Sequence, residues 1–468
     1  MQPDNPAQEA VAFGKVRSYV WPIHRHELKK LLPMFIMLFF VCFNYTILRN
    51  LKDALVLTKE HSGAEVIPFI KVWGILPAAI ICTMIFSYLS NHFSRKKVFY
   101  IIISTFISYY FLFAFFIYPI QDHLQADWLA NFFQSFLPVG FKGFIAMLRN
   151  WPLTIFYIMA ELWSTMVLMV LFWGFANEIT KISEARRFYS VLSIGSNTAS
   201  IIAGQVAVLL SSQMFSSSLF FGQDKWEQTL CKLTILVVLS GVGILLAFRW
   251  MTKNVLSDPK NIPEETQRLK KKEKKMSFRE SISYIAKSKY LLCIAVLVVS
   301  YNLVIHMVEV IWKDQLSQLY PNPQDIHDYL NNLTSIMGII STTTSLLLAG
   351  IIKRLGWTRT ALITPFVLLI TTIGFFTCFL TPTLISPIAI TLLGVTPLTL
   401  TVFLGSFQNC FTKAAKYSLF DITKDMAFIP LTPEHKLKGK ASIDGIGSRL
   451  GKSGGSFIYQ WLLVVFGS

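Results

Sequence analysis

Charged residues are scarce in this chain of 468 residues. Asp, Glu, Lys and Arg make up 15% of it, whereas they make up about 25% of a typical soluble domain. Hydrophobic residues make up 53%, and they form long runs separated by short clusters of charge. This composition excludes an ordinary soluble protein and indicates a membrane protein that crosses the bilayer several times.

Paired cysteines and processing signals are also lacking. The six cysteines stand singly and mostly within apolar runs, at Cys42, Cys82, Cys231, Cys293, Cys378 and Cys410. Without a paired spacing they support neither a disulfide framework nor a zinc site. The first thirty residues are polar and basic and lead directly into an apolar run, so they resemble neither a cleavable signal peptide nor a plastid transit peptide.

Catalytic motifs are missing as well. The chain has no H-E-x-x-H, no G-x-S-x-G and no Cys/His cluster. A Gly-Lys-Ser string around Lys452 invites comparison with a phosphate-binding P-loop. That motif requires four residues between its first glycine and Gly-Lys-Ser, but here three residues follow Gly447 and five follow Gly445, and no strand precedes them. We therefore expect neither an enzyme nor a cofactor.

Long apolar runs predict the transmembrane helices, since a helix needs about 20 residues to cross a bilayer. These helices are expected at 31–48, 67–90, 98–119, 152–178, 188–213, 231–250, 290–312, 333–352, 360–380, 386–409 and 453–467. The connection 121–151 is apolar on one side but too broken to span, which predicts a helix in the membrane interface. A twelfth helix is missing, so we expect the natural protein to continue beyond the last residue.

The predicted helices fall into two similar halves. FNYTILR at 43–49 aligns with YNLVIHM at 301–307, which pairs Asn44 with Asn302. In each half a basic loop also leads into a helix rich in Gly and Ser, although small residues recur in any membrane helix. Transporters built from repeated halves bind their substrate near the middle of the membrane, where the halves meet.

We therefore predict an all-α, polytopic, major-facilitator-like fold of two pseudo-symmetric six-helix bundles, the last helix being cut short. The expected parts are a cytoplasmic N-terminal segment (1–30), an N-terminal six-helix bundle (31–250), a basic cytoplasmic linker (251–289) and a C-terminal bundle with five spans (290–468).

Lys and Arg are distributed unevenly between the two sides of the predicted bundle. Alternate segments that start with the N-terminus hold 34 of the 43, the opposite loops hold 8, and Lys71 lies inside a span. Basic loops stay in the cytoplasm, so the N-terminus and the linker are expected there. Most of the net charge of +17 therefore reflects topology and gives no reason to expect a nucleic-acid partner.

Ionisable residues within the predicted spans mark a candidate substrate site, because charge at membrane depth usually faces a water-filled cavity. Glu161 is expected near mid-depth, where an unpaired carboxylate is costly; the alternative is a structural pair between helices. Glu309 lies one turn before Lys313 and one turn after His306, which fits either a cavity lining or a helix-surface pair.

Other candidates lie at helix ends. Arg49, Lys52 and Lys71 are expected near the outer ends of the first two spans, where they could form an anion-binding mouth; Lys71 alone could instead reach the interface. Lys452 begins a glycine-rich helix, whose free N–H groups favour phosphate. Tyr157, beside Phe156 and Trp163, could stack on a base, although chance placement explains any one aromatic residue equally well.

Several long strings resemble the nucleotide transporters (ATP/ADP translocases) of obligate intracellular bacteria and plastids. They are NYTILR, IPFIKVW, MAELW, FWGFANEITKISEARRFY, YNLVIHMVEVIWKDQL, KAAKYSLFDITKDMAFIPL and KGKASIDGIGSRLGKSGGS. The resemblance implies transport of ATP against ADP, or uptake of nucleoside triphosphates with protons. Two lysines and two glutamates needed for transport in that family correspond by motif to Lys71, Glu161, Glu309 and Lys452. Many relatives have an acid where this chain has Asn50, which leaves Arg49 less neutralised.

These observations predict an ATP/ADP exchanger in a bacterial inner membrane that works by alternating access as a monomer. The cations would meet the phosphates, and the carboxylates would pair with the lysines when the site is empty. The alternatives are a proton-coupled importer with Glu161 or Glu309 as proton carrier, a transporter of peptides or drugs, and a membrane-embedded enzyme or lipid flippase. The expected substrate-binding residues are Lys71, Glu161, Glu309, Lys452, Arg49, Lys52, Asn44, Asn302, Tyr157 and Lys313.

Overall fold

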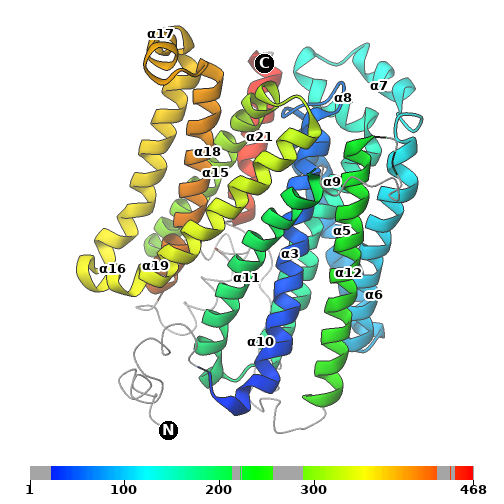
Figure 1. Ribbon diagram of the computed structural model, residues 1–468, viewed down its shortest axis with the longest axis vertical. Coiled ribbons are helices and arrows are strands. Elements are labelled where there is room, and N and C mark those ends of the chain that lie inside the picture. The colour runs from blue at the N-terminus through cyan, green and yellow to red at the C-terminus, as the bar shows by residue number, and fades with distance from the viewer. Residues whose placement is uncertain are drawn as a thin grey trace.

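The computed structural model describes residues 23–212, 222, 224–256, 288–428, 443 and 448–466. Within these ranges the chain is helical and contains no strand. Eight of the helices are long and apolar enough to cross a membrane, or nine if one sharply bent pair counts as a single span. The prediction of an all-α polytopic membrane protein is confirmed (Figure 1).

The first six spans form the N-terminal half. Their helices are α3 (Leu28–Thr58), α4 (Val66–Phe69) with η2 (Ile70–Ile75) and α5 (Leu76–His92), α6 (Arg95–Leu112) with η3 (Phe113–Ile117) and η4 (Tyr118–Ile120), α9 (Trp151–Leu162) with η6 (Trp163–Trp173) and α10 (Gly174–Ile179), α11 (Ile182–Ser211) and α12 (Lys225–Asn254). Three of these spans contain π-helical turns (η2, η3 and η6). Such turns inside α-helices are frequent at functional sites.

The C-terminal half consists of α15 (Lys289–Leu319), α16 (Pro323–Leu380), α17 (Pro382–Pro387) with η9 (Ile388–Leu392), α18 (Pro397–Ala415) with η10 (Lys416–Phe420) and α19 (Asp421–Ala427), and α21 (Ser448–Phe466). The long α16 holds two predicted spans. They are separated at Gly356, whose φ of 75° lies in the left-handed region that favours glycine.

One predicted span, 386–409, is wrong in its boundaries. The chain turns through 95° between η9 and α18, and the membrane helix begins only at Pro397. Gly394, with φ of 68°, makes this turn, and a proline is well suited to the first turn of the helix that follows. At its other end the helix continues through η10 and α19 to Ala427. Lys413, counted in a cytoplasmic loop by the sequence, therefore lies within a helix.

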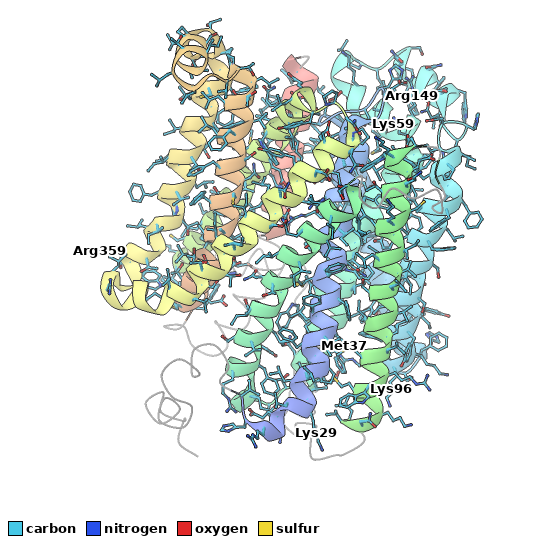
Figure 2. All side chains as sticks on the ribbon, in the orientation of Figure 1. Lys29, Met37, Lys59, Lys96, Arg149 and Arg359 are labelled. Atoms are coloured by element: carbon cyan, nitrogen blue, oxygen red, sulfur yellow. The ribbon has the colours of Figure 1, made fainter. Side chains whose placement is uncertain are left out.

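The basic loops that the structure describes lie toward one end of the molecule. Figure 2 shows Lys29, Lys96 and Arg359 toward one end, and Lys59 and Arg149 at the opposite end. At that opposite end the connection 121–151 forms two short helices, α7 (Asp127–Gln134) and α8 (Lys142–Arg149), joined through η5 (Val139–Phe141). Apolar side chains there are exposed, as a membrane-interface segment requires: Trp128, Phe132, Phe136 and Val139.

The two halves make close contacts near the end that lies away from the basic loops. Helix α11 packs against α16, where a Cβ added to Gly204 would lie only 2.6 Å from the backbone oxygen of Asn331. Helix α21 packs against α4, where the side chain of Gln460 donates to the carbonyl oxygen of Pro68 at 2.6 Å. Small residues allow such close approach between membrane helices.

Candidate substrate-binding site

Buried charges gather where the two halves meet. Asp53 of α3 accepts hydrogen bonds from Lys313 of α15 at 2.8 Å and from the neighbouring Lys52 at 3.0 Å. Lys52 also lies 3.0 Å from a carboxylate oxygen of Glu161 in α9. The side chains of Lys52, Asp53 and Lys313 are almost fully buried, whereas that of Glu161 is 28% exposed. A buried charge is stable only when it is paired, and here each has a partner.

Glu309 of α15 is the centre of a second cluster of ion pairs. Its carboxylate lies 2.9 Å from the ammonium of Lys413 in α18 and 3.6 Å from that of Lys313. His306 is 3.5 Å away on the same helix, and its Nδ1 lies 3.3 Å from the ammonium of Lys71 in η2. Lys313 contacts both carboxylates, Asp53 and Glu309, and so joins the two clusters into one network.

Polar contacts between the halves continue beside this network. Arg49 of α3 donates to Thr334 of α16 at 2.9 Å, and Asn50 donates to Asn331 at 2.8 Å. A cavity of about 40 Å³ lies here, lined by Arg49, Asn50, Asp53, Glu309, Trp312, Lys313, Leu330, Leu333, Thr334, Met337, Asn409, Cys410 and Lys413. Since a water needs at least ~10 Å³, the cavity has room for a few waters and is far too small for a nucleotide.

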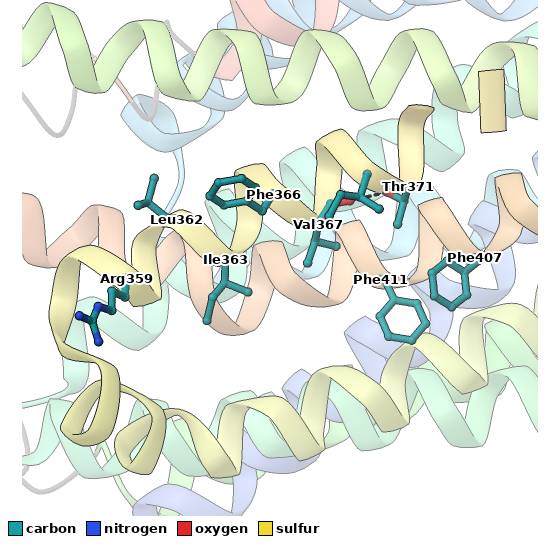
Figure 3. Close-up of a pocket in the computed structure, with 9 residues that line it drawn as sticks. Arg359, Leu362, Ile363, Phe366, Val367, Thr371, Phe407 and Phe411 are labelled. Atoms are coloured by element: carbon teal, nitrogen blue, oxygen red, sulfur yellow. Dashed lines mark hydrogen bonds between the residues drawn. The ribbon is translucent and has the colours of Figure 1, made fainter. Parts of the chain in front are cut away.

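A larger cavity, of about 480 Å³, lies on the outer surface of the C-terminal half. Figure 3 shows it between the second part of α16 and α18, with Arg359 at one end. Apart from Arg359 and Thr371 its lining is hydrophobic: Leu362, Ile363, Phe366, Val367, Ile370, Phe407 and Phe411. Several of these side chains are exposed, as on a helix face that meets lipid. Its chemistry does not suit a highly charged substrate.

The sequence profile of the TLC ATP/ADP transporter family matches residues 7–468. The chain belongs to this family. It is 46% identical over 457 residues to ADP,ATP carrier protein 1 of Chlamydia trachomatis, covering 97% of this chain and 86% of that protein. It is also 41% identical over 442 residues to the chloroplastic ADP,ATP carrier protein 1 of Arabidopsis thaliana, covering 94% of this chain and 69% of that protein.

Solved structures of sugar transporters share the fold of this ATP/ADP transporter family member. The xylose transporter XylE from E. coli, in a partially occluded inward open conformation, matches with a TM-score of 0.53 at 14% identity. The match covers 94% of this chain and 92% of XylE. At this identity the likeness concerns the fold alone, and it confirms the major-facilitator-like architecture.

Most of the predicted site residues of the transporter come together in the network or beside it. Those with hydrogen bonds or ion pairs there are Lys71, Glu161, Glu309, Lys52, Lys313 and Arg49. Asn302 lies next to it, buried in α15, and accepts a hydrogen bond from Lys416 of η10 at 3.4 Å. The side chain of Lys452 lies outside the described part of the chain. Its neighbour Gly451 in α21 approaches Asn302, since an added Cβ would be 2.7 Å from that of Asn302.

Two predicted residues have other contacts. Asn44 is buried and donates to the carbonyl oxygen of Val237 at 3.0 Å, so it ties α3 to α12. Tyr157 is also buried, and the ammonium of Lys52 lies 3.7 Å from the centre of its ring. Its ring face therefore meets a cation in this conformation. Whether it contacts a base stays a prediction.

Four residues in the network or beside it are absent from the substrate-binding residues that the sequence predicted. Asp53 and His306 stood beside predicted residues, but their partners lie on distant segments. Lys413 and Lys416 were assigned to a loop because hydropathy ended the span too early. Their spacing of three residues was the available signal, because it places two lysines on one face of a continuing helix.

Proposed function

We propose that this chain exchanges ATP for ADP across a bacterial inner membrane by alternating access. The chlamydial relatives are named ADP,ATP carrier proteins and are 43–46% identical to this chain. The observation that carries the proposal is the charge network between the halves, in which Lys52 of one half and Lys313 and Lys413 of the other are held by carboxylates. A nucleotide polyphosphate is the kind of anion that can replace those carboxylates, because lysine and arginine bind phosphate strongly.

The ion pairs give obligatory exchange a physical reason. Opening the end that lies away from the basic loops requires Asp53 and Lys313 to separate. An unpaired buried charge is strongly unfavourable, so an empty transporter resists this movement. A bound nucleotide supplies negative charge to the lysines and lowers that barrier. The carrier therefore changes state chiefly when it is loaded.

Orientation follows from the loops. The N-terminus and the basic linker are cytoplasmic by the excess of Lys and Arg on their side. The close contacts along α11 and α16 then lie toward the outside, which supports a state closed to the exterior. External ATP would enter after these contacts open, and internal ADP would leave in the opposite cycle. We propose a monomer with no catalytic activity.

Reconstituted vesicles test the function. The purified full chain is placed in liposomes, and uptake of labelled ATP is measured with and without internal ADP and with a protonophore. Exchange predicts uptake that depends on internal ADP and is insensitive to the protonophore. If labelled ATP enters vesicles that contain no nucleotide, and the protonophore abolishes this uptake, the chain is instead a proton-coupled importer. Competition by GTP, CTP and UTP measures base selectivity in the same assay.

A further inference from the structure

We propose that the phosphates of the nucleotide take Lys413 away from Glu309, and that this change is passed through Lys313 to the Asp53 contact between the halves. The proposal rests on the proposed function and names the residue at which binding starts. It places Lys413 among the substrate-binding residues, although the sequence assigned it to a loop.

Lys413 is more accessible than the two lysines that hold Asp53. Its side chain is 20% exposed, compared with 4% for Lys313 and 2% for Lys52. It lines the cavity between the halves together with Arg49 and Asp53. A ligand that enters can therefore contact Lys413 before the buried pair behind it has moved.

A second lysine extends this surface along the same helical run. Lys416 follows Lys413 by three residues, a rise of about 4.5 Å along a helix. Its ammonium lies 3.4 Å from Oδ1 of Asn302 and 5.7 Å from the ring centre of Tyr301. Two ammonium groups at this spacing suit successive phosphates of one chain, since each phosphate offers several acceptor oxygens.

Glu309 is the internal competitor of the phosphates. Its carboxylate only accepts hydrogen bonds, and it lies beside the ammonium groups of Lys413 and Lys313. A phosphate group offers the same kind of acceptor with more negative charge. Binding at Lys413 therefore removes from Glu309 its nearest cation, at 2.9 Å.

Lys313 carries the effect to the other half. Its ammonium lies closer to the carboxylate of Asp53, at 2.8 Å, than to that of Glu309, at 3.6 Å. When Glu309 has lost Lys413, it attracts Lys313 more strongly and weakens the pair with Asp53. That pair joins α15 to α3, so phosphate binding in one half loosens the contact between the halves. This is a coupling free energy between two sites through a chain of ion pairs.

Affinity measurements on the purified full chain test the proposal. Binding of ATP, ADP, AMP and adenosine is measured for the wild type, Lys413→Met and Lys413→Arg. Loss of a charged contact is expected to weaken ATP binding about tenfold to hundredfold, with a smaller loss for AMP and none for adenosine. Lys413→Arg is expected to restore most of the affinity. Lys424→Met is the matched control, because Lys424 lies further along the same helical run beside Asp421 and Asp425 of its own helix.

The variant Glu309→Gln tests whether the Glu309 carboxylate competes with the phosphates for Lys413 or only stabilises the fold. Without the competing carboxylate, ATP should bind more tightly while exchange is impaired. Should Lys413→Met fail to fold, the double variant with Glu309→Gln removes both partners and is measured for the ratio of ATP to AMP affinity. An unchanged ratio, or weaker ATP binding by Glu309→Gln, overturns the proposal. A wild-type protein that binds no nucleotide overturns the proposed function instead.

Discussion

Lys313 of α15 donates to Asp53 of α3 across 2.8 Å, and this buried ion pair joins the two halves of the transporter. Lys52 holds the other oxygen of Asp53, and Glu309 lies 3.6 Å from Lys313. The pair is thus the middle of a row of alternating charges that begins in one half and ends in the other. In the proposed mechanism, opening between α3 and α15 separates this pair.

Removing either member of this pair should destabilise the protein, and removing both should cost less than the sum. Asp53→Asn or Lys313→Met each leaves a buried charge without its main partner, which costs about 3–5 kcal/mol. The double variant leaves neither, so the two losses are not additive. Thermal unfolding of the four proteins gives the coupling energy. Strictly additive losses would show that the two residues do not stabilise each other.

Asp53→Asn should also open the end of the molecule that lies away from the basic loops. Cys410 lines the cavity beside Asp53, so its labelling reports access once the other five cysteines are replaced. We expect Asp53→Asn to speed labelling by an impermeant maleimide added from outside. Lys30→Met is the control, because Lys30 pairs with Glu184 at 2.6 Å inside the N-terminal half. That variant should lose stability without faster labelling, and equal acceleration in both would argue against a gating role.

Gly204 should be required for the closed contact between α11 and α16. A Cβ there would meet the backbone oxygen of Asn331 at 2.6 Å and also the hydroxyl of Ser335. Gly204→Ala therefore forces the helices apart, at a cost of about 1–3 kcal/mol, and should slow ATP/ADP exchange. Gly374→Ala is the control, since no atom lies within 4 Å of its added Cβ. Normal exchange by Gly204→Ala would mean that this contact does not have to form.

Hydropathy and intramembrane charge predicted the helices and most of the network, because both are local properties of the sequence. Glu161 and Glu309 stood out as acids within apolar runs. The pairing of Asp53 with Lys313 could not be predicted from local properties, since Lys313 lies 260 residues further along the chain. Lys413 was missed for a different reason. Polar residues near the end of a buried helix lower its hydropathy, so a helix that faces charge looks shorter than it is.

Lys71 should be needed for transport but not for folding. Its ammonium contacts His306 of the other half at 3.3 Å, and it has no carboxylate within ion-pair distance among the described residues. Lys71→Ala should abolish uptake of labelled ATP with little change in melting temperature, and Lys452→Ala is expected to behave in the same way. Lys59→Ala, which removes a pair with Asp122 at the end that lies away from the basic loops, is the control and should transport normally. Unaltered uptake by Lys71→Ala would remove it from the site.

Substitution of Tyr157 distinguishes a cation–π contact from stacking on a base. The ammonium of Lys52 lies 3.7 Å from the ring centre, and the buried hydroxyl has no hydrogen-bond partner among the described residues. Tyr157→Phe keeps the ring and should be nearly neutral, whereas Tyr157→Leu should lose about 0.5–2 kcal/mol of stability. If the ring only holds Lys52, neither variant changes the relative competition of GTP and ATP for uptake. A shift in that preference by Tyr157→Leu alone would show that the ring contacts the base, because Lys52 must then leave its face during the transport cycle.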